Sequence, residues 1–271
     1  MTGNIIEKVR LANPRIHCIT NYVTANDCAN ILLACGASPI MADCPEESGE
    51  ITSHCSGLVI NLGTLSPQRL EAMLISGKKA NELGLPVIFD PVGAGASEFR
   101  TNAAKQILSE VKTDIIRGNL SEIRSLAGVS SHEHGVDTAD MLTDDKLQRA
   151  VRPAKELSAK TGSVTVITGE NDIVTDSSSV YRIKNGHPIM SRITGCGCML
   201  SAVMGAFAAA APENRLLAAV EAVAAINICG ETAAARLTSQ EGNASCRSYL
   251  IDAVYRLTGE AVAEKANIEL L

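Results

Sequence analysis

The sequence predicts an α/β protein built as a single α/β/α sandwich around a mostly parallel central sheet. Strand-like and helix-like segments alternate along most of the chain. The predicted strands are short, continuous apolar runs, which is typical of parallel strands covered by helices on both faces. Because no shift in composition and no internal repeat divides the sequence, residues 1–271 are expected to form one domain.

Short apolar runs define the predicted strands, and Gly, Pro, Asn and Asp residues between them favour turns. The strands expected to be parallel span residues 16–20, 38–41, 58–62, 87–90, 115–117 and 164–168. Three more short strands, which lie near Gly and Asn turns, are expected to be antiparallel and span residues 173–176, 179–184 and 188–190.

Amphipathic patterning and capping residues predict the helices. Ser66 is a helix-capping residue, and Gly84 is a typical residue for ending the same helix. The polar stretch 128–145 is expected to be a loop. The predicted helices span residues 3–13, 27–35, 67–83, 98–111, 120–127, 146–161, 197–211, 214–236 and 246–265.

Composition excludes several classes of function. The net charge is −6 and no basic run occurs, which argues against nucleic acid or an anionic membrane surface as a partner. The sequence has no signal peptide and no apolar run of about 18 residues, so a cytoplasmic protein is expected. None of the nine cysteines forms a C-x-x-C pair, so most are predicted to be buried apolar residues.

Polar and glycine residues follow the predicted strands. Ligands of parallel α/β sheets bind at the carboxyl ends of the strands. We therefore expect one edge of the sheet to gather the residues found there, with Gly195 reaching the same edge from its loop. Those residues are Asn21, Met41, Gly63, Asp90, Asn119 and Thr168.

The most informative stretch, residues 193–202, is a glycine-rich turn that leads directly into a helix of small residues. Unpaired N–H groups at a helix start favour an anion, and glycines at 195 and 197 leave those groups accessible. Cys198 is expected in the first helical turn, where a thiolate is favoured. The stretch thus indicates a phosphoryl-transfer site with Cys198 facing a substrate hydroxyl. The alternative is a simple turn before a buried helix, with both cysteines in the core.

Two acidic residues and one arginine are further candidates for the site, and each acidic residue also has a purely structural interpretation. Asp90 follows an apolar strand and suits magnesium, which needs only one or two carboxylates, but Asp before Pro is also a common turn residue. Glu122 is either a group that acts on metal-bound water or the partner of Asn119 in a helix capping box. Arg117 suits phosphate oxygens. Thr168 with the glycine after it is a weaker candidate for a nucleotide phosphate.

The common nucleotide signatures are absent from the sequence. Neither a G-x-x-x-x-G-K-[ST] loop nor a G-x-G-x-x-G after the first strand occurs, and no G-x-S-x-G elbow supports Ser201 as a nucleophile. A nucleotide can still bind without these motifs, so their absence does not exclude nucleotide binding.

Several motifs, taken in order, resemble those of the hydroxyethylthiazole kinase family. They are ITNYVTAN at 19–26, IMA at 40–42, NLGT at 61–64, FDPVGA at 89–94, RGNLSEI at 117–123 and TGCGC at 194–198. The resemblance spans nearly the whole chain. It implies a ribokinase-like fold and ATP-dependent phosphorylation of 4-methyl-5-(2-hydroxyethyl)thiazole in thiamine biosynthesis or salvage. It also implies Mg²⁺ and a homotrimer whose active sites lie at subunit interfaces.

The resemblance assigns roles position by position. It implies ATP contacts at Arg117 and Thr168 and magnesium-organising carboxylates at Asp90 and Glu122. Cys198 matches the position of the catalytic base, where kinases of the wider fold usually have aspartate. The implied contacts to the thiazole are Met41 and Gly195, with Asn21 and Val23 as weaker candidates.

Two other functions fit the same residues. One is a kinase for another small alcohol, such as a hydroxymethylpyrimidine or a sugar. The other is a non-catalytic protein that binds thiazole or nucleotide, although Asp90, Arg117, Glu122 and Cys198 together argue against it.

Overall fold

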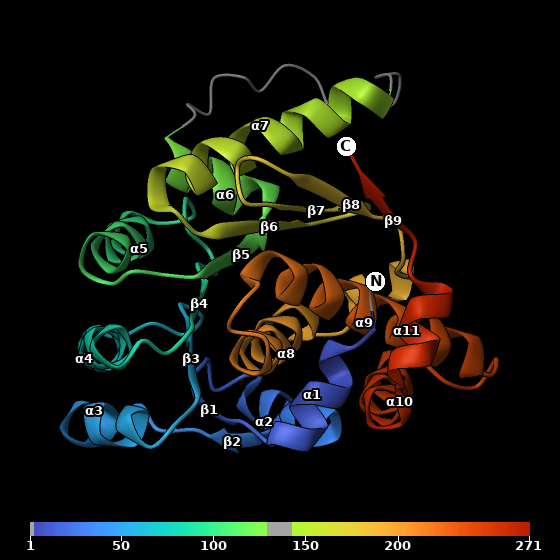
Figure 1. The fold of residues 1–271 in the computed structure, drawn as a ribbon, viewed down its shortest axis with the longest axis horizontal. Coiled ribbons are helices and arrows are strands. Elements are labelled where there is room, and N and C mark those ends of the chain that lie inside the picture. The colour runs from blue at the N-terminus through green and yellow to red at the C-terminus, as the bar shows by residue number, and fades with distance from the viewer. Residues whose placement is uncertain (1–2, 129–142) are drawn as a thin grey trace.

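A nine-stranded sheet organises the computed structural model, which describes residues 3–128 and 143–271 (Figure 1). The strand order is β2-β1-β3-β4-β5-β6-β7-β8-β9. The first six strands in this order pair in parallel, and β7, β8 and β9 continue the sheet in antiparallel fashion. The strands are β1 (Arg15–Ile19), β2 (Ser38–Ile40), β3 (Gly57–Asn61), β4 (Val87–Asp90), β5 (Ile115–Asn119), β6 (Val164–Thr168), β7 (Asp172–Thr175), β8 (Val180–Ile183) and β9 (Ile268–Leu270).

Helices cover both faces of the sheet, which confirms the predicted α/β/α sandwich (Figure 1). One layer holds α1 (Ile5–Ala12), α2 (Ala25–Cys35), α8 (Cys196–Ala210), α9 (Arg215–Arg236), α10 (Asn243–Arg256) and α11 (Gly259–Lys265). The other layer holds α3 (Pro45–Ser53), α4 (Pro67–Leu83), α5 (Glu98–Glu110), α6 (Leu120–Ala127) and α7 (Thr143–Thr161).

The core consists of two apolar clusters, one on each face of the sheet. Successive side chains of a strand point to opposite faces of the sheet and therefore join different clusters. Val59 of β3 belongs to the cluster around α8, whereas its neighbours Leu58 and Ile60 belong to the cluster on the other face. Helix α8 lies close to the sheet because it has a glycine at the contact. A Cβ on Gly205 would come within 2.7 Å of the Val59 side chain. This close packing fixes the position of α8 over the central strands.

The predicted strand at 188–190 is wrong. Those residues lie in a 3-10 helix, η2 (Pro188–Arg192), because Pro188 stands at its first position and the His187 ring accepts a hydrogen bond from the Ile189 N–H. The predicted helix 246–265 is two helices, α10 and α11, because Leu257 is extended and the Thr258 hydroxyl caps a new helix. Most of the predicted loop 128–145 lies outside the described residues.

Two elements escaped prediction. Helix α3 begins with Pro45 at its first position and two acidic residues in its first turn, which are ordinary signals of a helix start. Strand β9 has only three residues, too few for a periodic pattern, and pairs with β8 at the end of the sheet. There the Glu269 carboxylate forms ion pairs with Arg182 and Lys184.

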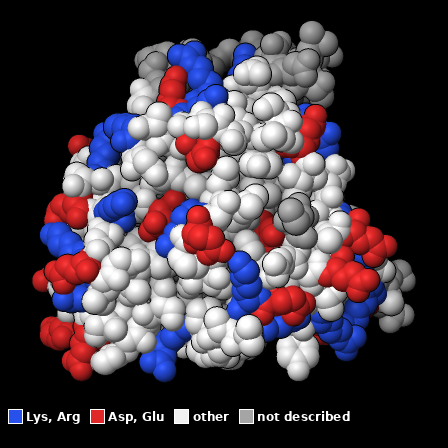
Figure 2. Space-filling model, viewed as in Figure 1, with Lys and Arg blue, Asp and Glu red and all other residues white. Residues whose placement is uncertain are grey.

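One helix in the described residues, α9, is long and apolar enough to cross a membrane. However, 78% of its apolar window is buried inside the protein. Its alanine-rich surface packs against α8 and α10, so it is a core helix of this fold. On the face drawn in Figure 2, acidic and basic side chains are interspersed around the edge of the molecule.

Candidate active site

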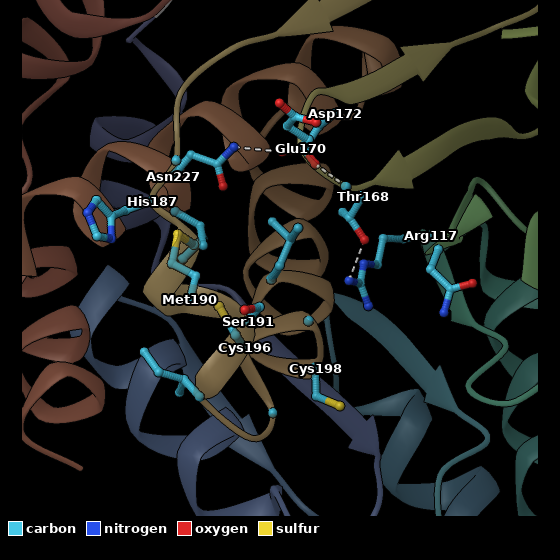
Figure 3. Close-up of a pocket in the computed structure, with 18 of the residues that line it drawn as sticks. Arg117, Thr168, Glu170, Asp172, His187, Met190, Ser191, Cys196, Cys198 and Asn227 are labelled. Atoms are coloured by element: carbon cyan, nitrogen blue, oxygen red, sulfur yellow. Dashed lines mark hydrogen bonds between the residues drawn. The ribbon is translucent and has the colours of Figure 1, made fainter. Parts of the chain in front are cut away.

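A cavity of about 790 Å³ opens at the carboxyl ends of β5 and β6 and the start of α8. Arg117, Thr168 and Cys198 lie on one side of it, and His187 and Met190 lie on the opposite side (Figure 3). The position agrees with the rule that parallel sheets bind ligands beyond the carboxyl ends of their strands. The cavity therefore contains the junction that the sequence indicated.

Two glycines shape that junction. Gly195 is the N-cap of α8 and has a φ of +85°, and a Cβ there would lie 2.5 Å from the Thr24 side chain. A Cβ on Gly197 would lie 2.4 Å from the Arg117 guanidinium. Larger residues at these positions would displace Thr24 and Arg117. The glycines thus allow side chains from β5 and the start of α2 to contact the backbone of the helix start.

The N–H groups of Gly197 and Cys198 form no hydrogen bond within the described residues, as expected in the first turn of a helix. The Cys196 N–H, in contrast, donates to the Ile193 carbonyl oxygen at 3.2 Å. Two adjacent donors, rather than the whole turn, are thus available to an anion in the cavity.

Cys198 is the third residue of α8, and its Sγ accepts hydrogen bonds from Asn21 Nδ2 at 3.3 Å and Asn61 Nδ2 at 3.4 Å. Burial and the nearby Asp90 carboxylate raise the pKa of the thiol above its ordinary value. The net shift is therefore opposite to the thiolate expected at this helix start, because burial and Asp90 disfavour the negative charge.

Asp90, at the end of β4, is fully buried. Its Oδ2 accepts hydrogen bonds from Asn61 Nδ2 and from the Ser201 hydroxyl, both at 2.8 Å, and lies 3.5 Å from Arg117 Nη1. Its Oδ1 has no hydrogen-bond partner. Burial raises the pKa of Asp90 to about 6, although Arg117 opposes the shift.

Arg117 connects this carboxylate to the next strand. Its Nη2 donates to Thr168 Oγ1 at 2.7 Å, so the two residues predicted to contact ATP are in direct contact (Figure 3). Both line the cavity, and the Arg117 side chain is 13% exposed. A planar cation held in this way between Asp90 and Thr168 is oriented to meet phosphate oxygens.

Glu122 forms the capping box that the sequence offered as an alternative. Its Oε2 accepts the Asn119 N–H at 2.8 Å, and Asn119 Oδ1 accepts the Glu122 N–H at 2.9 Å. The other carboxylate oxygen, Oε1, accepts the Gly93 N–H at 2.9 Å. The capping role is therefore confirmed, and it holds the carboxylate at the wall of the cavity.

The donor set fits a magnesium ion that is bound mainly by water and substrate phosphate. In the described part of the chain, no group of three or more His, Cys, Asp or Glu side chains is placed to hold a metal. Magnesium needs only one or two protein carboxylates when phosphates and waters complete its shell. The unpaired buried oxygen of Asp90 and the nearby Glu122 carboxylate satisfy that requirement.

Of the four residues predicted to contact the thiazole, two lie at or beside the cavity and two lie elsewhere on the surface of the chain. Gly195 lines the cavity, and Asn21 lies beside it in contact with Cys198. Val23 is 60% exposed and Met41 is 38% exposed, and neither lines the cavity. The structure therefore brings Asn21 and Gly195 close to Cys198 and leaves the apolar side chains of Val23 and Met41 on the surface.

Arg69, which sequence reasoning missed, ties together three loops on this side of the site. Its Nη1 donates to Thr64 Oγ1 at 2.8 Å, its Nη2 donates to the Thr20 carbonyl oxygen, and its Nε lies 3.2 Å from Asp43 Oδ2. These partners belong to the loops after β3, β1 and β2. We call residues 20–24, 41–44 and 62–66 the Arg69-linked loops.

Sequence reasoning also missed Asn61 and Ser201, which hold Asp90. Asn61 ends an apolar strand within the NLGT motif, which could have marked it, but Ser201 gives no such signal inside a helix of small residues. At the far end of the cavity, Asn227 Nδ2 donates to the buried Asp172 carboxylate at 2.6 Å. These pairs join residues distant in sequence, so local patterns do not reveal them.

The fold of the chain is ribokinase-like. A ribokinase-like superfamily protein from Enterococcus faecalis shares the fold with a TM-score of 0.62, although it is only 12% identical, and the match covers 93% of this chain and 95% of that one.

A sequence model of the hydroxyethylthiazole kinase family matches residues 6–260, so the chain belongs to that family. It is 52% identical to a hydroxyethylthiazole kinase of Clostridium acetobutylicum, over 97% of both sequences. It also resembles the structure of a hydroxyethylthiazole kinase protein from Pyrococcus horikoshii, with a TM-score of 0.88, 33% identity, and coverage of 99% of this chain and 98% of that chain. These matches confirm the family that the motifs predicted.

The buried carboxylate of Asp90 predicts how stability depends on pH. Its pKa in the folded protein, about 6, exceeds the ordinary value of 3.8, so the folded chain holds this proton more tightly than the unfolded chain. Ionisation therefore costs stability as the pH rises through this interval. Relative to wild type, Asp90→Asn should gain about 2 kcal/mol in free energy of unfolding between about pH 4 and about pH 7.

Urea unfolding of the protein without nucleotide, in the presence of a metal chelator, measures this gain. Asp252→Asn is the control, because it removes an exposed carboxylate of α10 that water solvates. An Asp90→Asn gain that does not depend on pH would contradict the prediction.

Proposed function

We propose that this protein transfers the γ-phosphoryl group of ATP to the hydroxyl of 4-methyl-5-(2-hydroxyethyl)thiazole, in thiamine biosynthesis or salvage. Membership of the hydroxyethylthiazole kinase family supports the substrate. One observation carries the chemistry: the free N–H groups at the start of α8, the Cys198 thiol and the Arg117 guanidinium, which is paired with the buried Asp90, line one cavity.

Phosphoryl transfer depends mainly on alignment and on neutralising charge, with little covalent chemistry for the protein. The substrate oxygen forms a bond to the γ-phosphorus while the bond to the ADP oxygen breaks. The hydroxyl proton passes to the sulfur of Cys198, which acts as general base in its thiolate form and becomes the thiol. The N–H groups of Gly197 and Cys198 and the Arg117 guanidinium stabilise the negative charge on the transferred group.

Arg117 and Thr168 are the proposed ATP contacts, because both line the cavity and their mutual hydrogen bond fixes the guanidinium. Asp90 and Glu122 would hold Mg²⁺, directly or through water. The ion would supply charge neutralisation between the phosphates. Asn61 and Ser201 keep the Asp90 carboxylate in one orientation, with its Oδ1 left without a partner.

We also propose a cytoplasmic homotrimer in which a neighbouring subunit completes the thiazole site. The exposure of Val23 and Met41 supports this assembly, because apolar side chains proposed to bind an apolar ring are on the surface of the single chain. Tyr22, next to Val23, is 77% exposed as well. A partner surface over the Arg69-linked loops would cover all three side chains.

A comparison of acceptors tests the substrate. With ATP and Mg²⁺, we expect kcat/KM for the thiazole alcohol to exceed that for a hydroxymethylpyrimidine or ribose by about 100-fold or more, since a shaped site discriminates by contacts made in the transition state. Radiolabelled γ-phosphate transfer is the measurement, with assays lacking acceptor as the control for ATP hydrolysis.

Equal or faster phosphorylation of the pyrimidine or of ribose would reassign the enzyme to another small alcohol. Binding of ATP and thiazole, seen by calorimetry without any phosphorylated product, would indicate a non-catalytic binding protein instead.

Substitutions of Cys198 test the proposed base. We expect Cys198→Ala to lower kcat by about 100-fold, which is a modest effect for general base catalysis, because alignment and charge provide most of the rate. Cys198→Asp should retain activity, since a carboxylate is also a proton acceptor. Cys196→Ala, two residues earlier in the same helical turn, is the matched variant and should lose less than about tenfold. If Cys198→Ala keeps the wild-type kcat, the base role is wrong.

A substitution of Arg69 tests whether the Arg69-linked loops together support the proposed thiazole contacts. The Arg69→Gln variant removes the charge and most donors that join the three loops, so the proposed thiazole contacts lose their common support. We expect the KM for the thiazole alcohol to rise by about tenfold or more, while the KM for ATP changes by less than about twofold. Arg236→Gln, which removes an ion-paired arginine of α9, is the control. A parallel rise in both KM values would contradict a role limited to these loops.

A further inference from the structure

Cys198 is held in an unusual hydrogen-bonding environment for a thiol, because two side-chain amides donate to the same sulfur. Asn21 Nδ2 lies 3.3 Å and Asn61 Nδ2 lies 3.4 Å from Cys198 Sγ. Asn61 is the last residue of β3, and Asn21 lies two residues beyond the end of the neighbouring parallel strand β1, so the sheet brings the two asparagines together.

The orientation of the Asn21 amide follows from its other partners. Its Oδ1 accepts the Thr24 N–H at 3.1 Å and the Thr24 hydroxyl at 3.0 Å. The amide nitrogen must therefore face the opposite way, toward Asn61 Oδ1 at 3.0 Å and the sulfur. A flipped amide would place its N–H groups against the Thr24 N–H.

The Asn61 amide is fixed in the same manner. Its Oδ1 accepts the Gly63 N–H at 2.9 Å as well as the hydrogen bond from Asn21. Its nitrogen donates to Asp90 Oδ2 at 2.8 Å and to Cys198 Sγ. Because Asn61 is fully buried, a flip would leave a donor facing the Gly63 N–H and an acceptor facing a carboxylate. All four amide hydrogens are thus assigned, and two of them point at the sulfur.

We infer that Asn21 and Asn61 form a paired amide donor site that stabilises negative charge on the sulfur of Cys198. They act as positioning residues through Cys198. The inference rests on the proposed phosphoryl transfer, in which the sulfur accepts the proton of the substrate hydroxyl as that oxygen bonds to phosphorus. It also gives Asn21 a role within the protein, in addition to the proposed contact with the thiazole.

The surroundings of Cys198 disfavour a negative charge on its sulfur, and the amide donors oppose that effect. Burial raises the pKa of Cys198, and the Asp90 carboxylate of β4 raises it further. Hydrogen bonding with the side chains of Thr24 and Asn21 and the positive charge of Arg117 on β5 lower it. The other titratable groups that face this sulfur are Cys28 of α2 and Cys196 of α8. A base in this partly buried position benefits from fixed donors, because they offset the solvation that burial removes from the thiolate.

Alkylation of the full-length protein without substrates tests the inference. The rate of Cys198 modification by iodoacetamide, followed against pH, reports the thiolate fraction. We expect the midpoint to rise by about one pH unit in Asn21→Ala and in Asn61→Ala, so that the rate below the midpoint falls about tenfold. Tandem mass spectrometry must resolve the site, because Cys196 and Cys198 share the tryptic peptide that follows Arg192.

Each sample contains its own control. Cys44 is exposed and lies on another loop, so its midpoint should be the same in the variants and in wild type. The wild type alone gives a second test that does not depend on the variants folding. Burial raises the pKa of Cys196 to about 11, and no side-chain amide in the described residues donates to its sulfur, so Cys198 should titrate at lower pH than Cys196.

A Cys198 midpoint at or above that of Cys196, or variants whose Cys198 midpoint stays at the wild-type value while Cys44 is also unchanged, would overturn the inference. The proposed kinase activity is judged separately by phosphate transfer. A protein with the expected alkylation profile and no thiazole phosphorylation would retain the donor site and lose the proposed function.

Discussion

The site depends on one constraint, which is that a carboxylate at the end of β4 is buried without contact with water. Burying a charge is costly unless neighbouring groups pair with it. Asp90 therefore requires donors from three directions, and Asn61, Ser201 and Arg117 supply them from β3, α8 and β5. Each of these residues in turn fixes another part of the site: Asn61 holds Cys198, and Arg117 holds Thr168. The arrangement of these side chains beside the cavity thus follows from the contacts of Asp90 Oδ2.

The fold makes this arrangement possible through close approach of its backbone segments. Gly205 lets α8 rest on the central strands, and Gly197 lets the Arg117 guanidinium lie against the first turn of the same helix. A parallel sheet places the ends of β1, β3, β4, β5 and β6 side by side, so single residues at those ends become neighbours. The unpaired N–H groups of α8 and the Asp90 carboxylate then lie at one edge with opposite electrostatic character, which is suited to a phosphate that is carried with a cation.

The sequence predicts those features that depend on local patterns. The parallel strands were placed to within one or two residues because most of them are buried apolar runs, and the start of α8 was placed because glycines precede a helix of small residues. The capping box of Glu122 is also local, spanning three positions. In contrast, the hydrogen bonds of Asn61 and the contacts of Arg69 join segments far apart in sequence, and no periodicity encodes them. The thiolate expectation for Cys198 failed for the same reason, because burial is a tertiary property.

The two halves of the site differ in how completely one chain builds them. On the phosphate side, Arg117, Thr168 and Asp90 are joined by direct contacts, and all three are at least partly buried. On the alcohol side, Arg69 organises the loops, yet Val23 and Met41 are left facing outward. An apolar ring gains more binding energy when both of its faces leave water than when one does, because the gain scales with the apolar area buried. The exposure of these two side chains is therefore the feature that supports the proposed second surface, and it concerns the proposed alcohol half alone.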